Sequence, residues 1–361
     1  MKRVLCILSN MNAGGAETFL MKIYRQLDKN MYQMDFCINV KEPCFYEEEI
    51  LQKGGKIYRI PSKSEGLRVF ADKLYNVVKL NNYKYILRIT SNAAGFFDLK
   101  IAKKAGAKVC CARSSNSSDG GSWKAVLIHR ISRFLFDKYL DVRIAPSELA
   151  AMYTFGKRKK VNILHNAIDL GTYHYNAEGR MKVRKECGFI DSDIVVGHVG
   201  RFMAQKNHSF LLDVFYYLHK ENPKYKLLLI GKGELEETLK KKINDLKLNN
   251  AVIFAGVRND IPDVMSAMDI FVFPSLYEGM PNTVIEAQAT GLPCVIADTI
   301  TREANITNLV TYLPLRDAKE WADTVKNNIG GPRLDTEGLF RENKYDIESQ
   351  TEEFVRLVFP N

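Results

Sequence analysis

Two glutamates that stand eight residues apart, Glu278 and Glu286, carry the strongest chemical signal in this sequence. Glu278 follows an apolar run, and Glu286 lies inside the helix predicted over 281–290, whose first turn suits Pro281. The residues that would present N–H groups or a hydroxyl around this helix start are Gly279, Asn282 and Thr283. Free N–H groups and the positive end of a helix dipole bind anions. The segment therefore predicts a phosphate site between two carboxylates, and the alternative is an ordinary core helix with one glutamate at its edge.

A pair of cations forms the second candidate. Arg201 and Lys206 lie in a loop that begins at Gly200, directly after the apolar run 194–199. A planar guanidinium and a compact ammonium on one loop suit a diphosphate. Two solvated surface cations are the alternative, but the position at the end of a predicted strand favours ligand binding.

Two glycine-containing segments follow other predicted strands. Gly231 and Gly233 come after the run 226–230, and Gly14 and Gly15 lie between the first strand and the first helix. Glycine lets a backbone approach a ligand closely. Neither segment matches G-x-G-x-x-G or precedes the lysine of a P-loop, so each can equally be a tight turn between strand and helix.

The elements that must position these residues alternate between strands and helices. In the second half, strands are predicted at 194–199, 226–230, 251–255, 270–274 and 293–297. The helices between them are predicted at 207–221, 234–246, 261–268 and 281–290. The first half has predicted strands at 4–9, 34–40, 56–60, 85–89, 108–112 and 142–145, with helices from 16 and at 69–80 and 125–139. Such alternation predicts parallel sheets with helices on both faces, the α/β class.

Two such runs predict two doubly wound, Rossmann-like domains, which agrees with a length of 361 residues. The polar, glycine-containing stretch 165–188 is the predicted linker. We expect a first domain at 1–170, a second at 171–344, and a C-terminal helix at about 345–361 that packs back on the first. Open sheets bind ligands at the carboxyl ends of their strands, so a cleft between the two domains is the expected site.

The composition excludes several classes of protein. Apolar residues make up 46% and charged residues 26%, which is an ordinary globular balance and argues against disorder. The sequence has no stretch of 18 uninterrupted apolar residues, so no membrane span is expected. The short apolar run after Lys2 and Arg3 suits a first strand better than a signal peptide. The seven cysteines are scattered and lack a C-x-x-C pair, which indicates reduced thiols in the cytoplasm and neither a zinc site nor a disulfide framework.

Taken together and in the order in which they occur along the chain, these segments resemble the retaining glycosyltransferases of family 4, which have the GT-B fold. The segment 278–286 looks like the E-x7-E signature of that family. Three further segments occur in the family's order: Gly14-Gly15-Ala16-Glu17, Gly200-Arg201 with Lys206-Asn207, and Gly231-Lys232-Gly233. The segments 145–147 and 165–169 also resemble those before its interdomain linker. The resemblance covers most of the chain and is best over 194–297. The opening half looks most like bacterial enzymes that build capsule, exopolysaccharide or O-antigen repeats. It implies two Rossmann-like domains that face each other across a cleft.

The resemblance also implies a role for each candidate residue. Arg201 and Lys206 would bind the diphosphate of a nucleotide sugar and stabilise the leaving group. Glu278 would contact the transferred sugar, and Glu286 would hold the ribose. The remaining positions would border the donor: Gly14, Gly15, Gly200, Gly231, Gly233, Val257, Gly279, Met280, Asn282 and Thr283.

The resemblance also implies that no metal or other cofactor is required, because the two cations take the place of a metal. The sequence Asp191-Ser192-Asp193 superficially resembles a metal-binding DxD motif, but it precedes a strand and is expected to be a loop. The resemblance implies front-face transfer with retention, in which the leaving phosphate helps to deprotonate the acceptor. UDP is the expected donor nucleotide.

One departure from the family lies in the first half. Many relatives carry a histidine just after a late strand of the first domain, near the sugar. The corresponding stretch has Arg113, Ser115 and Asn116 and no histidine, and His129 falls in a predicted helix. Either one of these three residues makes the acceptor-side contact, or the acceptor chemistry differs.

The charge of +10 is unevenly distributed and points to the acceptor. Residues 1–160 hold 29 Lys and Arg against 14 Asp and Glu, 51–160 alone hold 23 against 7, and 161–361 hold 23 against 28. In GT-B enzymes the first domain receives the acceptor, and a basic domain attracts anionic lipid surfaces and polyprenyl diphosphates. The expected enzyme is therefore a hexosyltransferase that acts on a lipid-linked or saccharide acceptor at the inner face of the plasma membrane. A generally basic soluble surface is the alternative.

Three other functions compete with this one. A nucleotide-sugar epimerase of the same fold would need clear acid and base groups around the sugar. A non-catalytic protein that binds nucleotide sugars or polysaccharide would tolerate the loss of Glu278, Arg201 or Lys206, and all three are present. A nucleic-acid binder would need aromatic or arginine-rich recognition elements, which the scattered basic residues do not form.

Overall fold

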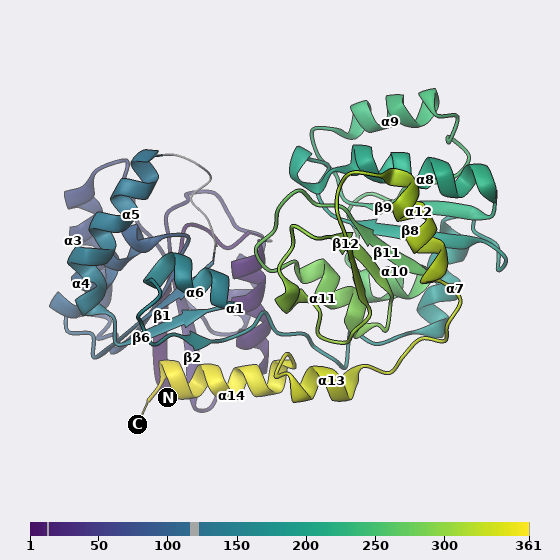
Figure 1. Cartoon of the computed structure of the whole chain (residues 1–361). Coiled ribbons are helices and arrows are strands. Elements are labelled where there is room, and N and C mark those ends of the chain that lie inside the picture. Colours follow the sequence, from purple (N-terminus) through teal and green to yellow (C-terminus); the bar gives the residue numbers. More distant parts are fainter. Residues whose placement is uncertain (13, 116–122, 361) are drawn as a thin grey trace. The chain divides into compact units, whose positions relative to one another are not determined.

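A computed structural model describes residues 1–12, 14–115 and 123–360. The chain divides into two compact units, which we call the first unit (Met1–Ala167 with Lys344–Asn361) and the second unit (Ile168–Asn343). Both units consist of a parallel sheet covered by helices, which confirms the predicted α/β class. Figure 1 shows the two units with their labelled elements.

Within the described residues, the sheet of the first unit has seven parallel strands in the order β3-β2-β1-β4-β5-β6-β7. These strands are β1 Lys2–Ile7, β2 Tyr32–Ile38, β3 Ile57–Arg59, β4 Tyr85–Thr90, β5 Val109–Ser114, β6 Val142–Ala145 and β7 Asn162–Ile163. The helices are α1 Gly15–Gln26, α2 Glu47–Gln52, α3 Leu67–Leu80, α4 Phe96–Lys104, α5 Trp123–Phe136, α6 Glu148–Phe155 and α14 Ile347–Val358. The described residues of this unit also form the 3₁₀ turns η1 Ala93–Gly95 and η2 Asp137–Tyr139.

Strand β1 shows why this sheet is covered on both faces. Val4 and Cys6 belong to one buried cluster, together with residues of α1 and α14. Leu5 and Ile7 belong to a second cluster, together with residues of α3, α4 and α6. Successive side chains of a strand point to opposite faces, so a continuous apolar run requires a helical layer on each side.

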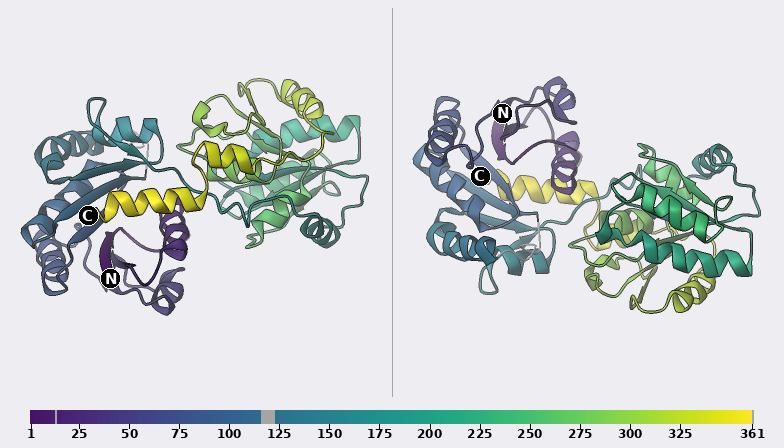
Figure 2. Two further views of the ribbon diagram at one scale, coloured as in Figure 1. Left: turned by 90° about the horizontal axis from the view of Figure 1, so that it is seen from below. Right: turned by 90° about the horizontal axis from the view of Figure 1, so that it is seen from above.

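The C-terminal helix α14 belongs to the first unit although it follows the whole second unit in the sequence. It lies against α1, and the turn after it places the Phe359 ring against Tyr32 and Tyr85. Lys2 Nζ donates to the carbonyl oxygens of Phe359 and Pro360 at 3.2 and 3.3 Å. The two ends of the chain therefore meet on one unit, as Figure 2 shows in two further views.

The second unit holds, in the described part of the chain, a six-stranded parallel sheet in the order β10-β9-β8-β11-β12-β13. Its strands are β8 Ile194–Val199, β9 Tyr225–Ile230, β10 Val252–Phe254, β11 Ile270–Phe273, β12 Cys294–Ala297 and β13 Val310–Leu313. Its helices are α7 Ala177–Glu186, α8 His208–Glu221, α9 Glu236–Asp245, α10 Ile261–Ala267, α11 Asn282–Ala289, α12 Ala318–Asn327 and α13 Glu337–Glu342, with 3₁₀ turns η3 Ala204–Lys206 and η4 Arg302–Ala304. The strand order reverses between β8 and β11, which is the place where doubly wound sheets bind ligands.

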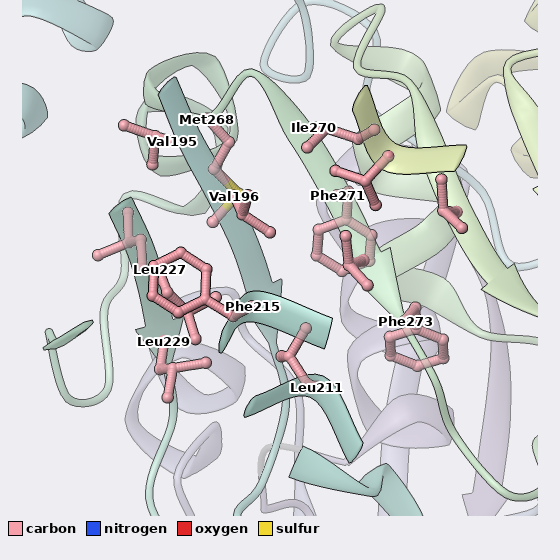
Figure 3. Close-up of a cluster of buried hydrophobic side chains, with 14 of the residues drawn as sticks. Val195, Val196, Leu211, Phe215, Leu227, Leu229, Met268, Ile270, Phe271 and Phe273 are labelled. Atoms are coloured by element: carbon pink, nitrogen blue, oxygen red, sulfur yellow. The ribbon is translucent and has the colours of Figure 1, made fainter. Parts of the chain in front are cut away.

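The core of the second unit is aliphatic and aromatic, and Figure 3 shows part of it. Val196 and Leu227 from the sheet pack near Leu211 and Phe215 of α8, and all four side chains are completely buried. Each such side chain contributes about 1.5–3 kcal/mol when it leaves water. This core holds the strand ends rigidly, which a binding site at those ends requires.

The predicted strands match observed strands to within two residues at each end. The predicted linker 165–188 is wrong in its second half, because α7 occupies Ala177–Glu186. The Asn176 side chain caps this helix by accepting a hydrogen bond from the backbone N–H of Glu178, and the helix packs against α10. Few of its side chains are apolar, so its sequence lacks the periodicity that reveals a helix.

Candidate active site

The loops at the carboxyl edge of the second unit's sheet are tied to one another by backbone hydrogen bonds. Gly200 N–H donates to the carbonyl oxygen of Ile230 at 2.9 Å, and Gly231 N–H donates to that of Gly256 at 2.8 Å. These bonds connect the loops after β8, β9 and β10. The loop after β11 joins through Leu276 N–H, which donates to the carbonyl oxygen of Gln205 at 2.9 Å. Four loops of distant sequence thus form one continuous edge.

Lys206 and Glu278, two of the three predicted catalytic residues, form an ion pair on this edge. Lys206 Nζ lies 2.7 Å from Glu278 Oε1, and the two side chains are only 17% and 11% exposed. The ammonium also lies 4.6 Å from the centroid of the Phe273 ring. A charge pair that is largely removed from water and backed by an aromatic face holds both groups in fixed positions.

The loop conformation explains how Lys206 reaches this place. The chain leaves β8 at Gly200, makes the 3₁₀ turn η3 and turns sharply at Asn207, whose φ is 54°. Gln205 Nε2 donates to the carbonyl oxygen of Tyr277 at 2.8 Å, which ties η3 to the loop that carries Glu278. The Lys206–Glu278 pair is therefore supported by backbone contacts on both of its loops.

Arg201, the third predicted catalytic residue, is exposed at the start of the same loop. Within the described ranges, no hydrogen bond or ion pair holds its side chain. A guanidinium with five donors that is free on the carboxyl edge can bind an anionic group from solution. The loop therefore presents two cations: Lys206, which is fixed by its ion pair with Glu278, and Arg201, whose side chain is exposed.

Helix α11 begins at Asn282, four residues after Glu278. Pro281 precedes the helix, and its side chain does not cap the first turn. Asn282, Thr283 and Glu286 are half-buried, as are Gly279 and Met280 in the loop before the helix. This start places the positive end of a helix dipole after β11, at the same edge of the sheet as the two cations.

At two glycines of this edge, Gly231 and Gly233, the neighbouring backbone leaves no room for a side chain. A Cβ atom on Gly231 would lie 2.2 Å from the carbonyl oxygen of Gly200, and one on Gly233 would lie 2.4 Å from that of Phe202. Gly231 also has a φ of 134°, a conformation that L-residues rarely adopt. Val257, the other residue predicted at this edge, follows Gly256 and is 65% exposed.

Two buried histidines, His198 and His208, lie near Lys206 and were not predicted as a pair. Their ring centroids are 4.5 Å apart, and His198 Nδ1 bonds to the carbonyl oxygen of Val272 at 2.8 Å. Burial and the positive charge of Lys206 lower the pKa of His208 to about 4, and burial lowers the pKa of His198 as well. Because the two residues are separated by a strand end and a loop, no spacing rule connects them in the sequence.

We expect the His208→Phe variant to lose less stability in acid than the wild type. The pKa of His208 is about 4 in the folded chain against an ordinary value of 6.5, so the unfolded chain takes up the proton first. Its contribution to stability is complete above pH 6.5 and is lost as the pH falls toward 4. From pH 7.5 to 5.0 the wild type should lose roughly 2 kcal/mol more than the variant in urea unfolding. The emission of buried Trp321 reports this transition.

The exposed His174 provides the matched control. A His174→Phe variant should keep the acid sensitivity of the wild type. If the His208→Phe variant loses as much stability at pH 5.0 as the wild type does, the titration of this buried histidine is not the cause.

The predicted residues of the first unit lie at two places. Gly14 and Gly15 form the start of α1, where a Cβ on Gly14 would lie 2.4 Å from Glu17 Oε2. Ser115 follows β5 and is exposed. Asn116, the third acceptor-side candidate, lies outside the described residues.

Arg113 is almost completely buried at the end of β5. Its Nη2 donates to Asn166 Oδ1 at 2.8 Å, and its guanidinium lies 3.6 Å from the centroid of the Phe19 ring. Burial lowers its pKa to about 9. His165 lies in the same unit, where its ring stacks on Tyr345 at 4.0 Å, while His129 lies in helix α5 as predicted.

The DxD-like segment lies at the opposite end of the second unit's sheet. Asp193 directly precedes β8, and its carboxylate accepts from the backbone N–H of Ile190 at 2.9 Å. This hydrogen bond closes a turn between Ile190 and Asp193, which gives the aspartate a structural role. Among the described residues, no helix is long and apolar enough to cross a membrane.

Comparison with known proteins identifies the family. The family described as glycosyl transferases group 1 matches residues 193–329. The Bacillus subtilis (strain 168) protein EpsF, which is named as a glycosyltransferase, is 36% identical over 334 residues, which make up 90% of this chain and 87% of EpsF. The Escherichia coli UDP-Gal:alpha-D-GlcNAc-diphosphoundecaprenol alpha-1,3-galactosyltransferase is 34% identical over 142 residues, 38% of this chain and 37% of that enzyme.

The fold has a close counterpart among solved structures. The crystal structure of Anabaena Alr3699/HepE in complex with UDP and glucose superposes with a TM-score of 0.78 at 18% identity, and the match covers 100% of both chains. The two parallel sheets of the present chain match this architecture, which confirms the predicted GT-B fold. The chain belongs to the group 1 glycosyl transferases and is a glycosyltransferase of the GT-B fold.

Proposed function

We propose that this glycosyltransferase moves a sugar, with retention of its anomeric configuration, from a UDP-sugar to a lipid-linked or saccharide acceptor during the synthesis of a bacterial surface polysaccharide. The Lys206–Glu278 ion pair, 2.7 Å long and mostly shielded from water, is the observation that carries the proposal. It fixes a cation on the loop that also carries Arg201, and its carboxylate comes four residues before the start of α11. This edge suits a diphosphate that gains negative charge as its bond to the sugar breaks.

In the proposed reaction, the bond between the sugar C1 and the diphosphate oxygen breaks while the acceptor oxygen forms a bond to C1 on the same face. The acceptor proton passes to the leaving phosphate. Lys206 and Arg201 stabilise the charge on that phosphate, and Glu278 holds the transferred sugar through its hydroxyl groups. Glu286, one turn inside α11, is proposed to bind the ribose. No metal is needed in this scheme, because the two cations supply the positive charge.

The donor and the acceptor are proposed from the relatives. The matching Escherichia coli enzyme is named for UDP-Gal as its donor and for a diphosphoundecaprenol-linked sugar as its acceptor. Residues 51–160, all in the first unit, carry 23 basic against 7 acidic residues, a charge that attracts diphosphates and anionic lipid. We propose that the enzyme works as a peripheral protein at the inner face of the plasma membrane.

A donor panel tests this function. UDP-, GDP- and ADP-sugars are incubated with the full chain, with and without lipid-diphosphate-linked sugars, and nucleotide release is measured in the presence of EDTA. We expect acceptor-dependent release from UDP-sugars that survives chelation, and an NMR coupling constant of the product that shows retention. No binding of any donor at millimolar concentration would contradict the transferase proposal. Conversion of a donor into its epimer without an acceptor would identify an epimerase.

A further inference from the structure

Helix α5 is amphipathic in the opposite sense from a normal surface helix. Its buried residues are the polar His129 and Ser132. Six large apolar residues of the same helix are exposed: Trp123, Leu127, Ile128, Ile131, Phe134 and Leu135. Phe134 is 88% exposed and Trp123 is 71% exposed. A helix of a soluble domain normally buries its apolar stripe, so an apolar face of this size turned to solvent indicates a binding surface.

Specific contacts hold α5 in this orientation. His129 Nδ1 accepts a hydrogen bond from the backbone N–H of Ala93 at 3.0 Å. The Nε2 atom of the same ring then carries the proton and donates to the carbonyl oxygen of Tyr153 at 3.1 Å, and the His129 ring stacks on the Tyr153 ring. Turning the helix to bury its apolar side would break both hydrogen bonds and leave the backbone N–H of Ala93 without its partner. The polar side is therefore anchored to η1 and α6, and the apolar side is left to solvent.

The helix and the segment that follows it are also rich in exposed basic residues. Residues 123–160 contain nine Lys and Arg against three Asp and Glu. The exposed cations in this range are Lys124, Arg130, Lys138, Lys157, Arg158, Lys159 and Lys160. The loop that begins at Gly156 lies beside α5, because a Cβ on Gly156 would be 3.4 Å from Arg133 Nη1. Helix α6 also exposes Leu149 and Met152. We call the six apolar residues of α5, with the seven exposed cations, the α5 face.

We propose that the α5 face is the surface through which the enzyme inserts into an anionic lipid bilayer. This inference deepens the membrane contact proposed above by naming the element that makes it. Apolar side chains with tryptophan at the rim enter the boundary between headgroups and acyl chains, and each nearby cation adds about 1 kcal/mol with anionic lipid. A second copy of the chain would fit this face poorly, because it would bring two strongly positive surfaces together.

Vesicle binding tests the proposal on the full chain. The protein is mixed with vesicles of phosphatidylcholine alone or with 30% phosphatidylglycerol, and bound protein is measured by sedimentation. We expect binding only to the anionic vesicles, lost at high salt, with a blue shift of tryptophan emission and quenching by brominated lipid. The signal arises from Trp123, because Trp321, the other tryptophan, is completely buried in the second unit.

Matched variants separate insertion through the α5 face from nonspecific binding through any exposed apolar side chain. The double variant Ile131→Ser/Phe134→Ser removes two exposed apolar side chains from α5 and should lower the partition coefficient by about tenfold or more. The Leu80→Ser variant removes a side chain that is 82% exposed on α3, outside the α5 face, and should bind vesicles within about twofold of the wild type. Equal binding by the double variant and the wild type would overturn the proposal.

Two further outcomes separate lipid insertion from dimer formation and from the transfer reaction. If the wild type does not bind vesicles and sediments as a dimer that the double variant abolishes, the α5 face is a contact between copies and the lipid proposal is wrong. Nucleotide release with a soluble acceptor should be the same in wild type and double variant. Release without vesicle binding would contradict only the membrane inference, and vesicle binding without release from any donor would contradict only the proposed transfer.

Discussion

Replacing Lys206 by alanine is expected to lower the rate of acceptor-dependent nucleotide release by about 10²- to 10³-fold. Lys206 Nζ is held 2.7 Å from Glu278 and is backed by the Phe273 ring, so its charge is already in place before the donor binds. The negative charge on the leaving diphosphate grows as the bond to the sugar breaks, and a preorganised cation stabilises this transition state more than the bound donor. We therefore expect a large loss in kcat and a smaller rise in KM.

Two companion variants make this result interpretable. Lys241 is exposed on α9, and the Lys241→Ala variant should release nucleotide at the wild-type rate. The Glu278→Gln variant keeps the shape of the pair and removes one charge, so it tests the carboxylate separately from the packing. Circular dichroism confirms that each variant is folded. A Lys206→Ala enzyme that retains the wild-type rate while folded would remove this residue from the proposed mechanism.

The second large effect is expected at Gly231, where alanine should lower the free energy of unfolding of the second unit by about 3 kcal/mol or more. The new Cβ would lie 2.2 Å from the carbonyl oxygen of Gly200, and the φ of 134° is unfavourable for alanine. Neither the strand nor its neighbour can shift without disturbing the Gly200 and Gly231 hydrogen bonds that join three loops. We also expect a loss of donor binding, because these loops carry Arg201.

Two other glycines separate the two causes of this loss. Gly256 has a positive φ of 66° but open space around its Cβ position, so the Gly256→Ala variant should lose only about 1–2 kcal/mol. Gly338 lies inside helix α13 with nothing near its Cβ position, so the Gly338→Ala variant should gain about 0.5–1 kcal/mol. Urea unfolding followed by the emission of Trp321 measures all three. Similar losses at Gly231 and Gly256 would show that the close contact with Gly200 is unimportant.

The fold class and the candidate motifs could be predicted from local patterns. Apolar runs such as 194–199 and 270–274 are long enough to be buried on both faces, and the helical periods between them leave only a parallel sheet with helices on each side. Glu278, Arg201 and Gly231 were identified because residues after such runs lie at the carboxyl edge of the sheet. Helix α7 could not be found in this way, because its sequence has too few apolar residues to show a period.

Contacts between loops could not be predicted, because they depend on the order of the strands in the sheet, and local sequence patterns do not reveal that order. Lys206 and Glu278 are separated by 72 residues, and they meet because β8 and β11 are neighbours in the sheet, with Val196 opposite Ile270. The His198–His208 pair likewise arises from the way the loop after β8 folds back.

The orientation of α5 also depends on contacts between segments that are distant in the sequence. The sequence alone determined that 125–139 would be helical, and it determined the excess of basic residues in the first half. Periodicity favours burial of the apolar side of a helix, but the hydrogen bonds of His129 to Ala93 and Tyr153 turn the polar side inward. Those partners lie 36 and 24 residues away in the sequence. Local residue patterns determine which elements form, and only the packing of distant segments decides which side chains meet and which face remains exposed.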